Sequence, residues 1–200
     1  MLNNCSGKHT GFLTLAKHLA ASAESYLDLD APVQKAVADA FAEVTETTQP
    51  LAFGTDGCSA PNFAAPLIGI ARAMAKFAAP ESFGGVRREA ASQLIDAMRT
   101  HPILVSGEGR ACLALTNATE GRAVVKTGAD GVFTGICHEK GFGFCLKIDD
   151  GNVPACETLC AALLVRVGAL DPAHPTAQHY LNTKITNWNG EVTGTRSACL

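Results

Sequence analysis

The sequence lacks the features that mark membrane, nucleic-acid-binding and secreted proteins. No apolar run reaches the roughly 18 residues that a membrane-spanning helix needs. No basic stretch is present, and the net charge is -3, which argues against nucleic-acid and membrane-surface partners. The N-terminus has no basic region followed by an apolar core, so we expect no secretory signal. We therefore expect a cytoplasmic protein without nucleic-acid or membrane partners.

The sequence also lacks internal repeats and low-complexity linkers. Its 200 residues, 47% of them hydrophobic, are enough for one globular domain with a sizeable core. We therefore expect a single domain over residues 1–200.

The eight cysteines are not spaced as a disulfide framework. Cys156 and Cys160 lie four apart on a predicted helix, which places both on one buried face. Buried free cysteines behave as small hydrophobes, and a reducing cytoplasm suits them.

Apolar periodicity predicts helices in the first half of the chain and strands in the second. Helices are expected over residues 9–26, from Asp30 with Pro32 in its first turn, and over residues 66–77 and 85–98. From Ala111 the pattern alternates, which predicts strands over residues 111–117, 122–127, 132–138 and 142–149, joined by short turns with glycine. A helix over residues 153–167, led by Asn152, and one more strand near residues 185–196 complete an α+β fold, an antiparallel sheet with packed helices.

Cys5, Lys8 and His9 lie at the start of the first predicted helix, where exposed amides favour anions and thiolates. Together with Cys58, they provide two thiolates and a nitrogen ligand, a set that suits zinc. The spacing is not that of a C-x-x-C pair, so spacing alone favours a half-buried thiol and a surface lysine.

Asp56 lies beside Cys58 in the turn-forming segment Thr55-Asp56-Gly57-Cys58. A carboxylate next to a thiol is a candidate for chemistry, but stabilisation of a turn is the more common role of such an aspartate.

Lys126-Thr127-Gly128 lies at the end of the predicted strand over residues 122–127. A lysine, a hydroxyl residue and a glycine on such a strand recur in serine β-lactamases and penicillin-binding proteins. Those enzymes also carry a Ser-x-x-Lys nucleophile motif on a helix, and this sequence contains none.

Several motifs occur together in one order. They are Asn3-Asn4-Cys5-Ser6-Gly7-Lys8-His9, Gly54-Thr55-Asp56-Gly57-Cys58 followed by Pro61 and Pro66, Gly107-Glu108-Gly109-Arg110, Lys126-x-Gly128-Ala129-Asp130 and Lys147-x-Asp149-Asp150-Gly151-Asn152. With them the chain closely resembles the rhizobial-type (class 3) L-asparaginases, the asparaginase II family.

The resemblance implies an amidohydrolase that converts L-asparagine to aspartate and ammonia by acyl transfer. It also implies a homodimer with a fold like that of serine β-lactamases and glutaminases. By the same resemblance Cys5, Lys8 and Cys58 hold a zinc ion and Lys126 is the catalytic lysine of a Ser-Lys tandem. The substrate pocket is lined by three further residues: His9, Asp56 and Cys112.

The chain departs from the family in one respect. In complete members both nucleophilic serines and the first tandem lysine lie upstream of the Cys5-Lys8 motif. The chain therefore resembles the C-terminal two-thirds of the family, with the N-terminal part missing, and we expect it to be nearly inactive by itself.

Two other functions agree with the same residues. One is a noncatalytic zinc- or amino-acid-binding protein that uses Cys5, Lys8 and Cys58. The other is a cysteine-dependent amidohydrolase with Cys58 as nucleophile and His9 as base.

Overall fold

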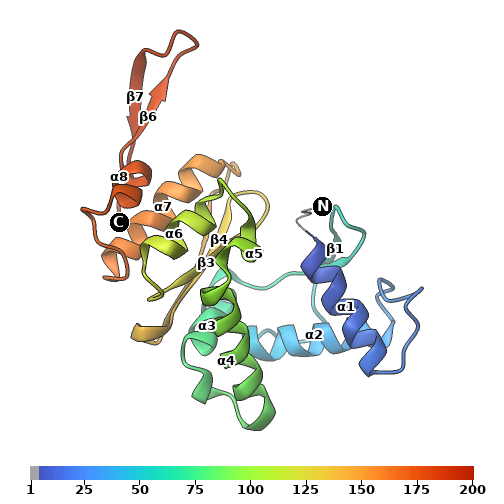
Figure 1. The fold of residues 1–200 in the computed structure, drawn as a ribbon. Coiled ribbons are helices and arrows are strands. Elements are labelled where there is room, and N and C mark those ends of the chain that lie inside the picture. The colour runs from blue at the N-terminus through green and yellow to red at the C-terminus, as the bar shows by residue number, and fades with distance from the viewer. Residues whose placement is uncertain (1–4) are drawn as a thin grey trace. The chain divides into compact units, whose positions relative to one another are not determined.

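The computed structural model describes residues 5–200 and divides the chain into two compact units, residues 1–72 and 73–200 (Figure 1). Each unit is described by itself. The motif residues Asn3 and Asn4 lie outside the described residues. The single domain over residues 1–200 stays a prediction.

The first unit begins with α1 (Ser6–His18), which is shorter than the predicted helix over residues 9–26. Cys5 is its N-cap residue. The helix ends because Ala20 adopts a left-handed conformation with φ 51°, after which the N–H of Ala21 donates to the carbonyl of Ala16. This is the hydrogen-bond pattern that commonly closes helices.

The rest of the first unit is a second helix and a short hairpin. Helix α2 (Pro32–Thr45) has Pro32 in its first turn, as predicted, but its N-cap residue is Ala31 rather than Asp30. Strands β1 (Phe53–Thr55) and β2 (Pro61–Phe63) pair antiparallel and enclose the loop of residues 56–60. That loop had been predicted as a turn-rich segment.

The second unit is built around the antiparallel sheet β3-β4-β5. Its strands are β3 (Val124–Thr127), β4 (Val132–Cys137) and β5 (Phe142–Lys147), which confirms three of the four predicted strands. The fourth prediction was wrong, because residues 111–117 belong to helix α6 (Ala111–Ala118). Ala111, Cys112 and Leu115 are buried at helical spacing, and packing on the sheet decides the conformation of this short apolar run.

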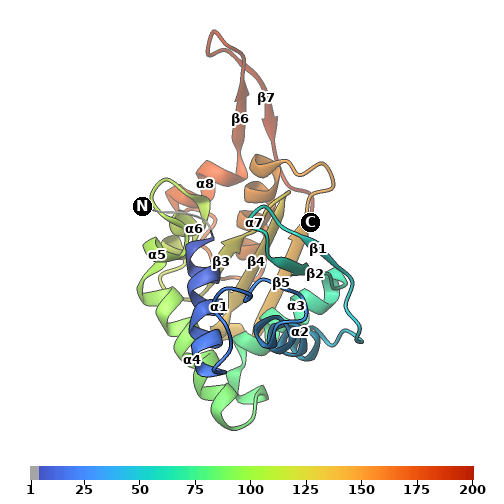
Figure 2. The same ribbon diagram turned by 90° about the vertical axis from the view of Figure 1, so that its right-hand side faces the viewer.

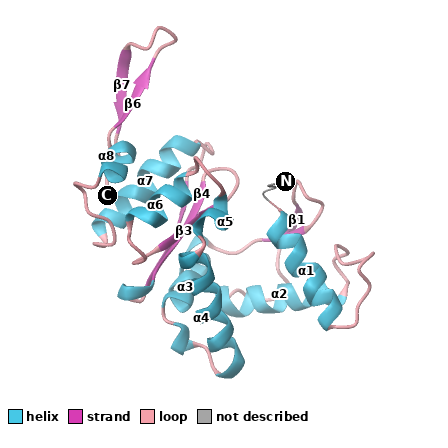
Figure 3. Ribbon diagram, viewed as in Figure 1, coloured by secondary structure: helices cyan, strands magenta, loops and turns pink. Residues whose placement is uncertain are grey.

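The two faces of the sheet carry different side chains. Phe133 and Leu146 lie on one face, in a cluster with α6 and α7 (Val153–Arg166). Val124 and Ile136 lie on the other face, in a smaller cluster with residues of α3 (Leu67–Ala78) and α4 (Gly85–Thr100). The sheet is thus covered by helices on both faces (Figures 2 and 3).

Two glycines permit the close packing of the sheet. A Cβ atom at Gly135 would collide with the ring of Phe144 on the neighbouring strand. A Cβ atom at Gly143 would collide with the α3 backbone at Met74 and Ala75. Any side chain at either position would push these elements apart.

Helix α7 confirms the prediction for residues 153–167. The Asn152 side chain accepts a hydrogen bond from the N–H of Ala155, as an N-cap does. Cys156 and Cys160 are both buried on this helix, as predicted.

The remaining elements connect or extend this core. They are the 3-10 helices at Pro80–Ser82 and His138–Lys140, α5 (Pro102–Ser106), α8 (Pro175–Leu181), β6 (Thr183–Thr186) and β7 (Val192–Arg196). Strands β6 and β7 form a hairpin that projects from the second unit (Figures 1 and 2). Trp188, between the two strands, is fully exposed. The sequence predicted one strand here rather than two.

The fold class is α+β, with helices and small antiparallel sheets. The likeness to serine β-lactamases stays a prediction. No helix within the part of the chain that the structure describes is long and apolar enough to cross a membrane.

Candidate active site

The loop between β1 and β2 is organised by Asp56. Its Oδ1 accepts hydrogen bonds from the N–H of Cys58 at 2.8 Å and the N–H of Ala60 at 3.1 Å. Ser59 takes a left-handed conformation with φ 68°, which turns the chain back toward β2. The turn-stabilising role expected of Asp56 is therefore present, and it holds Cys58 in place.

The second carboxylate oxygen of Asp56 links this loop to α1. Oδ2 forms an ion pair with Nζ of Lys8. The hydrogen bond from Lys8 holds the pKa of Asp56 down at about 2, burial partly opposes this, and the N–H groups of Ala60 and Cys58 lower the pKa further. Asp56 is therefore ionised at neutral pH.

Cys5 and Cys58 form a disulfide, with their Cα atoms 6.9 Å apart and 53 positions between them in sequence. This differs from the free thiols expected from spacing. The remaining cysteines are free: Cys112, Cys137, Cys145, Cys156, Cys160 and Cys199. The structure thus brings Cys5, Lys8, Asp56 and Cys58 together in the first unit.

His9 contacts Tyr26, a residue that sequence reasoning missed. Its Nδ1 lies 2.7 Å from the Tyr26 hydroxyl. The fully buried Gln34 donates from Nε2 to the carbonyl of Tyr26 at 2.8 Å. Tyr26 thereby fixes the His9 ring, and Gln34 fixes Tyr26.

Cys112 and Lys126 lie in the second unit. Strand β3 is an edge strand, and two of its N–H groups donate to side chains of α6. Thr127 donates to Sγ of Cys112 at 3.1 Å, and Val125 donates to Oγ1 of Thr116 at 3.3 Å. Four residues along a helix span nearly the same length as two residues along a strand, so both acceptors of α6 lie opposite donors of β3. Cys112 thus helps to cover the edge of the sheet.

Burial raises the pKa of Cys112, and the hydrogen bond from Thr127 opposes this. Lys126 is exposed, and its Nζ donates to the carbonyl of Thr127 at 2.7 Å. Its ammonium group is therefore open to solvent on the face of the sheet that packs against α4.

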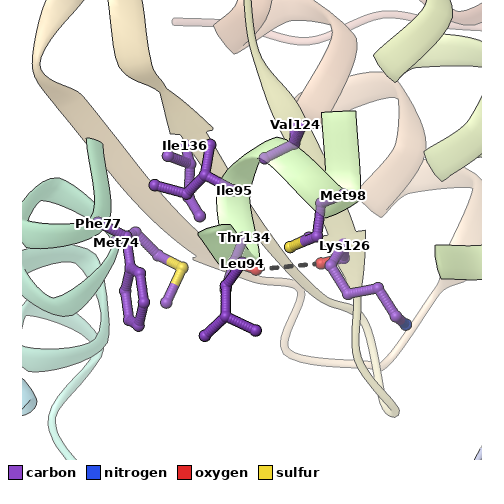
Figure 4. Close-up of a pocket in the computed structure, with 9 residues that line it drawn as sticks. All are labelled: Met74, Phe77, Leu94, Ile95, Met98, Val124, Lys126, Thr134 and Ile136. Carbon is purple, nitrogen blue, oxygen red and sulfur yellow. Dashed lines mark hydrogen bonds between the residues drawn. The ribbon is translucent and has the colours of Figure 1, made fainter. Parts of the chain in front are cut away.

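An apolar cavity of about 300 Å³ lies on this face of the sheet. Met74, Phe77 and Leu94 line it together with the stem of Lys126, and the Lys126 amine points away from these apolar side chains (Figure 4). Thr134 donates its hydroxyl to the carbonyl of Lys126 at 3.2 Å. The lining suits apolar groups rather than a small polar substrate.

The residues expected to hold zinc, Cys5, Lys8 and Cys58, all lie in the first unit. No group of three or more His, Cys, Asp or Glu side chains among residues 5–200 is arranged to hold a metal. Two thiolates and the Lys8 amine would suit zinc, and the structure gathers all three residues. The set fits the metal only when the sulfurs are reduced, because the thiolate is the ligand.

The chain thus combines an α+β fold with a cluster of Lys8, Asp56 and the Cys5–Cys58 disulfide. The sequence profile of the L-asparaginase II family matches residues 1–198. The chain belongs to the L-asparaginase II family. No curated protein matches the chain.

Proposed function

We propose that the chain serves the hydrolysis of L-asparagine to L-aspartate and ammonia. Membership of the L-asparaginase II family over residues 1–198 supports amide hydrolysis as the reaction class. The observation that carries the proposal is the cluster of Lys8 and Asp56 with the Cys5–Cys58 pair, because residues about 50 positions apart converge on one polar site.

The side chains of the first unit match the charges of asparagine. Asp56 is ionised and can accept hydrogen bonds from the α-ammonium group of the substrate. His9, held by Tyr26, can donate from its Nε2 to the α-carboxylate. In the metal-free state Lys8 is paired with Asp56, and as a zinc ligand it would leave the Asp56 charge to the substrate.

The proposal also gives roles to Lys126 and Cys112, which belong to the second unit. An exposed ammonium group such as that of Lys126 stabilises an alkoxide beside it and can relay a proton. The proposal assigns that role to Lys126 and substrate contact to Cys112.

The proposal also includes one zinc ion on Cys5, Cys58 and Lys8. Zinc supplies a Lewis acid and a link between two chain segments. Here it would tie the start of α1 to the loop of residues 56–60, beside Asp56.

The nucleophile limits what the chain can do alone. Its 200 residues contain no Ser-x-x-Lys sequence, and loss of a nucleophile lowers rates by several orders of magnitude. We expect asparagine binding with little turnover. This also favours the second candidate function, noncatalytic binding of an amino acid or zinc.

The cysteine-dependent alternative has less support. The sulfur of Cys58 is bonded to Cys5, so it is no nucleophile in this state. His9 contacts the Tyr26 hydroxyl through Nδ1, and within residues 5–200 it makes no hydrogen bond to the sulfur of Cys58.

Calorimetry with asparagine and a coupled ammonia assay test the proposal. Asp56→Asn keeps an Oδ1 acceptor for the loop but loses the charge, so asparagine binding should weaken about 10- to 100-fold. Asp30→Asn is the matched control, because the Asp30 side chain is 96% exposed. Glutamine, tested in parallel, reports the substrate preference.

Three results would decide among the functions. Binding without ammonia release supports a binding role, and turnover that is lost in Lys126→Ala supports catalysis. Absence of both asparagine binding and turnover contradicts the proposal. Light scattering of the same samples tests the predicted homodimer, and cell fractionation tests the predicted cytoplasmic location.

A further inference from the structure

The Cys5–Cys58 pair has two mutually exclusive uses. In this structure the two sulfurs are bonded to each other. A metal ion binds thiolates, and a sulfur in a disulfide carries no such charge. The same two residues therefore cannot form the disulfide and hold zinc at the same time.

We propose that Cys5 and Cys58 form a redox switch that controls metal binding, an inference that rests on the zinc site of the proposed function. The oxidised state is the disulfide and binds no metal. The reduced state provides two thiols that bind one zinc ion together with Lys8.

The reductant is a dithiol. One of its thiolates attacks the disulfide, the bond between Cys5 and Cys58 breaks, and the mixed disulfide is then resolved by the second thiol. Two electrons and two protons pass to Cys5 and Cys58, and the dithiol leaves as its own disulfide. Zinc binding then releases three protons to solvent, one from each thiol and one from the Lys8 ammonium group.

The surroundings of the pair suit this exchange. Both cysteines are only half-buried, so a small dithiol can approach them. Cys112, Cys137, Cys156 and Cys160 are buried instead, and burial raises the pKa of Cys137 and of Cys156 to about 11. These buried free thiols are therefore poor partners for exchange, and reoxidation should act first on Cys5 and Cys58.

Asp56 keeps the site assembled when the disulfide opens. One carboxylate oxygen holds the N–H groups of Cys58 and Ala60, and the other pairs with Lys8. Neither interaction needs the sulfur–sulfur bond. The loop therefore stays connected to α1 while the pair is reduced and metal-free. When zinc binds Lys8, the N–H groups that the amine retains can still donate to Asp56.

The test uses the full 200-residue chain, prepared oxidised and after treatment with a dithiol. Alkylation under denaturing conditions should label six cysteines in the oxidised chain and all eight after reduction. Zinc, measured with a chromogenic chelator after unbound metal is removed, should be one equivalent higher in the reduced chain. Reoxidation should release that equivalent.

Two variants and one control assign the effect. Cys5→Ser and Cys58→Ser should each lose the additional zinc, with affinity lowered at least 100-fold, and circular dichroism verifies that each variant is folded. Cys199→Ser should behave like the unchanged chain, because Cys199 is exposed and free.

Equal zinc binding by the oxidised and reduced chains would overturn the proposal. So would eight labelled cysteines in the oxidised chain, or a reduced chain that gains no zinc. None of these readouts involves asparagine. Failure of the switch is therefore distinguishable from failure of the proposed function, which the asparagine assays test separately.

Discussion

Each of the two compact units of this chain is stabilised internally, and the kinds of interaction differ between them. The buried apolar residues of the second unit include large side chains such as Phe133, Leu115 and Leu164. Those described in the first unit are small: Ala16, Ala31, Val33, Ala42 and Ala60. The first unit instead has the Cys5–Cys58 disulfide and the Lys8–Asp56 ion pair.

The contrast separates stability from chemistry. Burial of large apolar side chains stabilises the second unit by about 1.5–3 kcal/mol for each one. The groups that link the first unit are those that titrate, bind metals or change oxidation state. The first unit should therefore respond to solution conditions, and the second should respond mainly to changes in packing.

The largest effect is expected from Phe133→Ala in the second unit. Phe133 is fully buried between β4 and the helices of the larger cluster. Truncation should lower the free energy of unfolding by about 3–5 kcal/mol, measured by chemical denaturation. Exposed Phe53→Ala is the control and should change little. Equal effects of the two substitutions would contradict the contrast.

Reduction of the Cys5–Cys58 disulfide should have the next largest effect. The bond closes a loop across 53 positions, so its loss should cost about 2–4 kcal/mol through the unfolded state. Hydrogen exchange should show the loss of protection within residues 5–72. Comparable loss throughout residues 73–200 would show that the disulfide stabilises both units.

A smaller effect is expected where α6 covers the edge of β3. Thr116→Val removes the acceptor for the N–H of Val125, which is buried. An unpaired buried donor should cost about 1–3 kcal/mol, measured by thermal unfolding with calorimetry.

Thr158→Val is the matched control for that substitution. Thr158 is buried, and its hydroxyl has no hydrogen-bond partner within the described residues. The same change of side chain should therefore be neutral or stabilising there. If both variants lose stability equally, the hydrogen bond to β3 is not what Thr116 contributes.

The smallest effect concerns pH and Glu157 of α7. Burial raises the pKa of Glu157, and the positive charge of Arg110 only partly offsets this. A carboxyl whose pKa is higher in the folded chain than in the unfolded chain adds stability at pH values below its unfolded-state pKa. That added stability is lost as the pH rises through the folded-state pKa.

Glu157→Gln should therefore raise the free energy of unfolding at pH 7 by on the order of 0.5 kcal/mol, seen as a higher melting temperature. At pH 4 the melting temperature should be unchanged. Exposed Glu81→Gln should show no such difference between the two pH values. A variant that is less stable than the unchanged chain at pH 7 would reverse the assigned sign.

Predictions from local pattern were accurate where the pattern was long or had clear ends. Helix α7 has Asn152 as its cap, and β4 and β5 alternate across a short turn. Residues 111–117 were misassigned because seven mostly apolar residues fit both a strand and a buried helix. Packing against the sheet decides between the two, and that packing cannot be read from the local sequence pattern.

The candidate site was predicted in part. Resemblance to the family selected Cys5, Lys8, Asp56 and Cys58, and the structure brings these residues together. Tyr26 was missed because its contact with His9 depends on how the chain returns after α1. No spacing rule describes such a return.

The sequence by itself determined the family, the α+β class and the residue types that can bind a metal or an amino acid. These follow from motifs and from the periods of helix and strand, which are local properties. The tertiary structure decided which of those residues meet. It paired Cys5 with Cys58, placed Lys8 on Asp56 and used Cys112 to cover the edge of β3. Contacts between distant residues depend on the path of the whole chain, because loop closure and packing select them together.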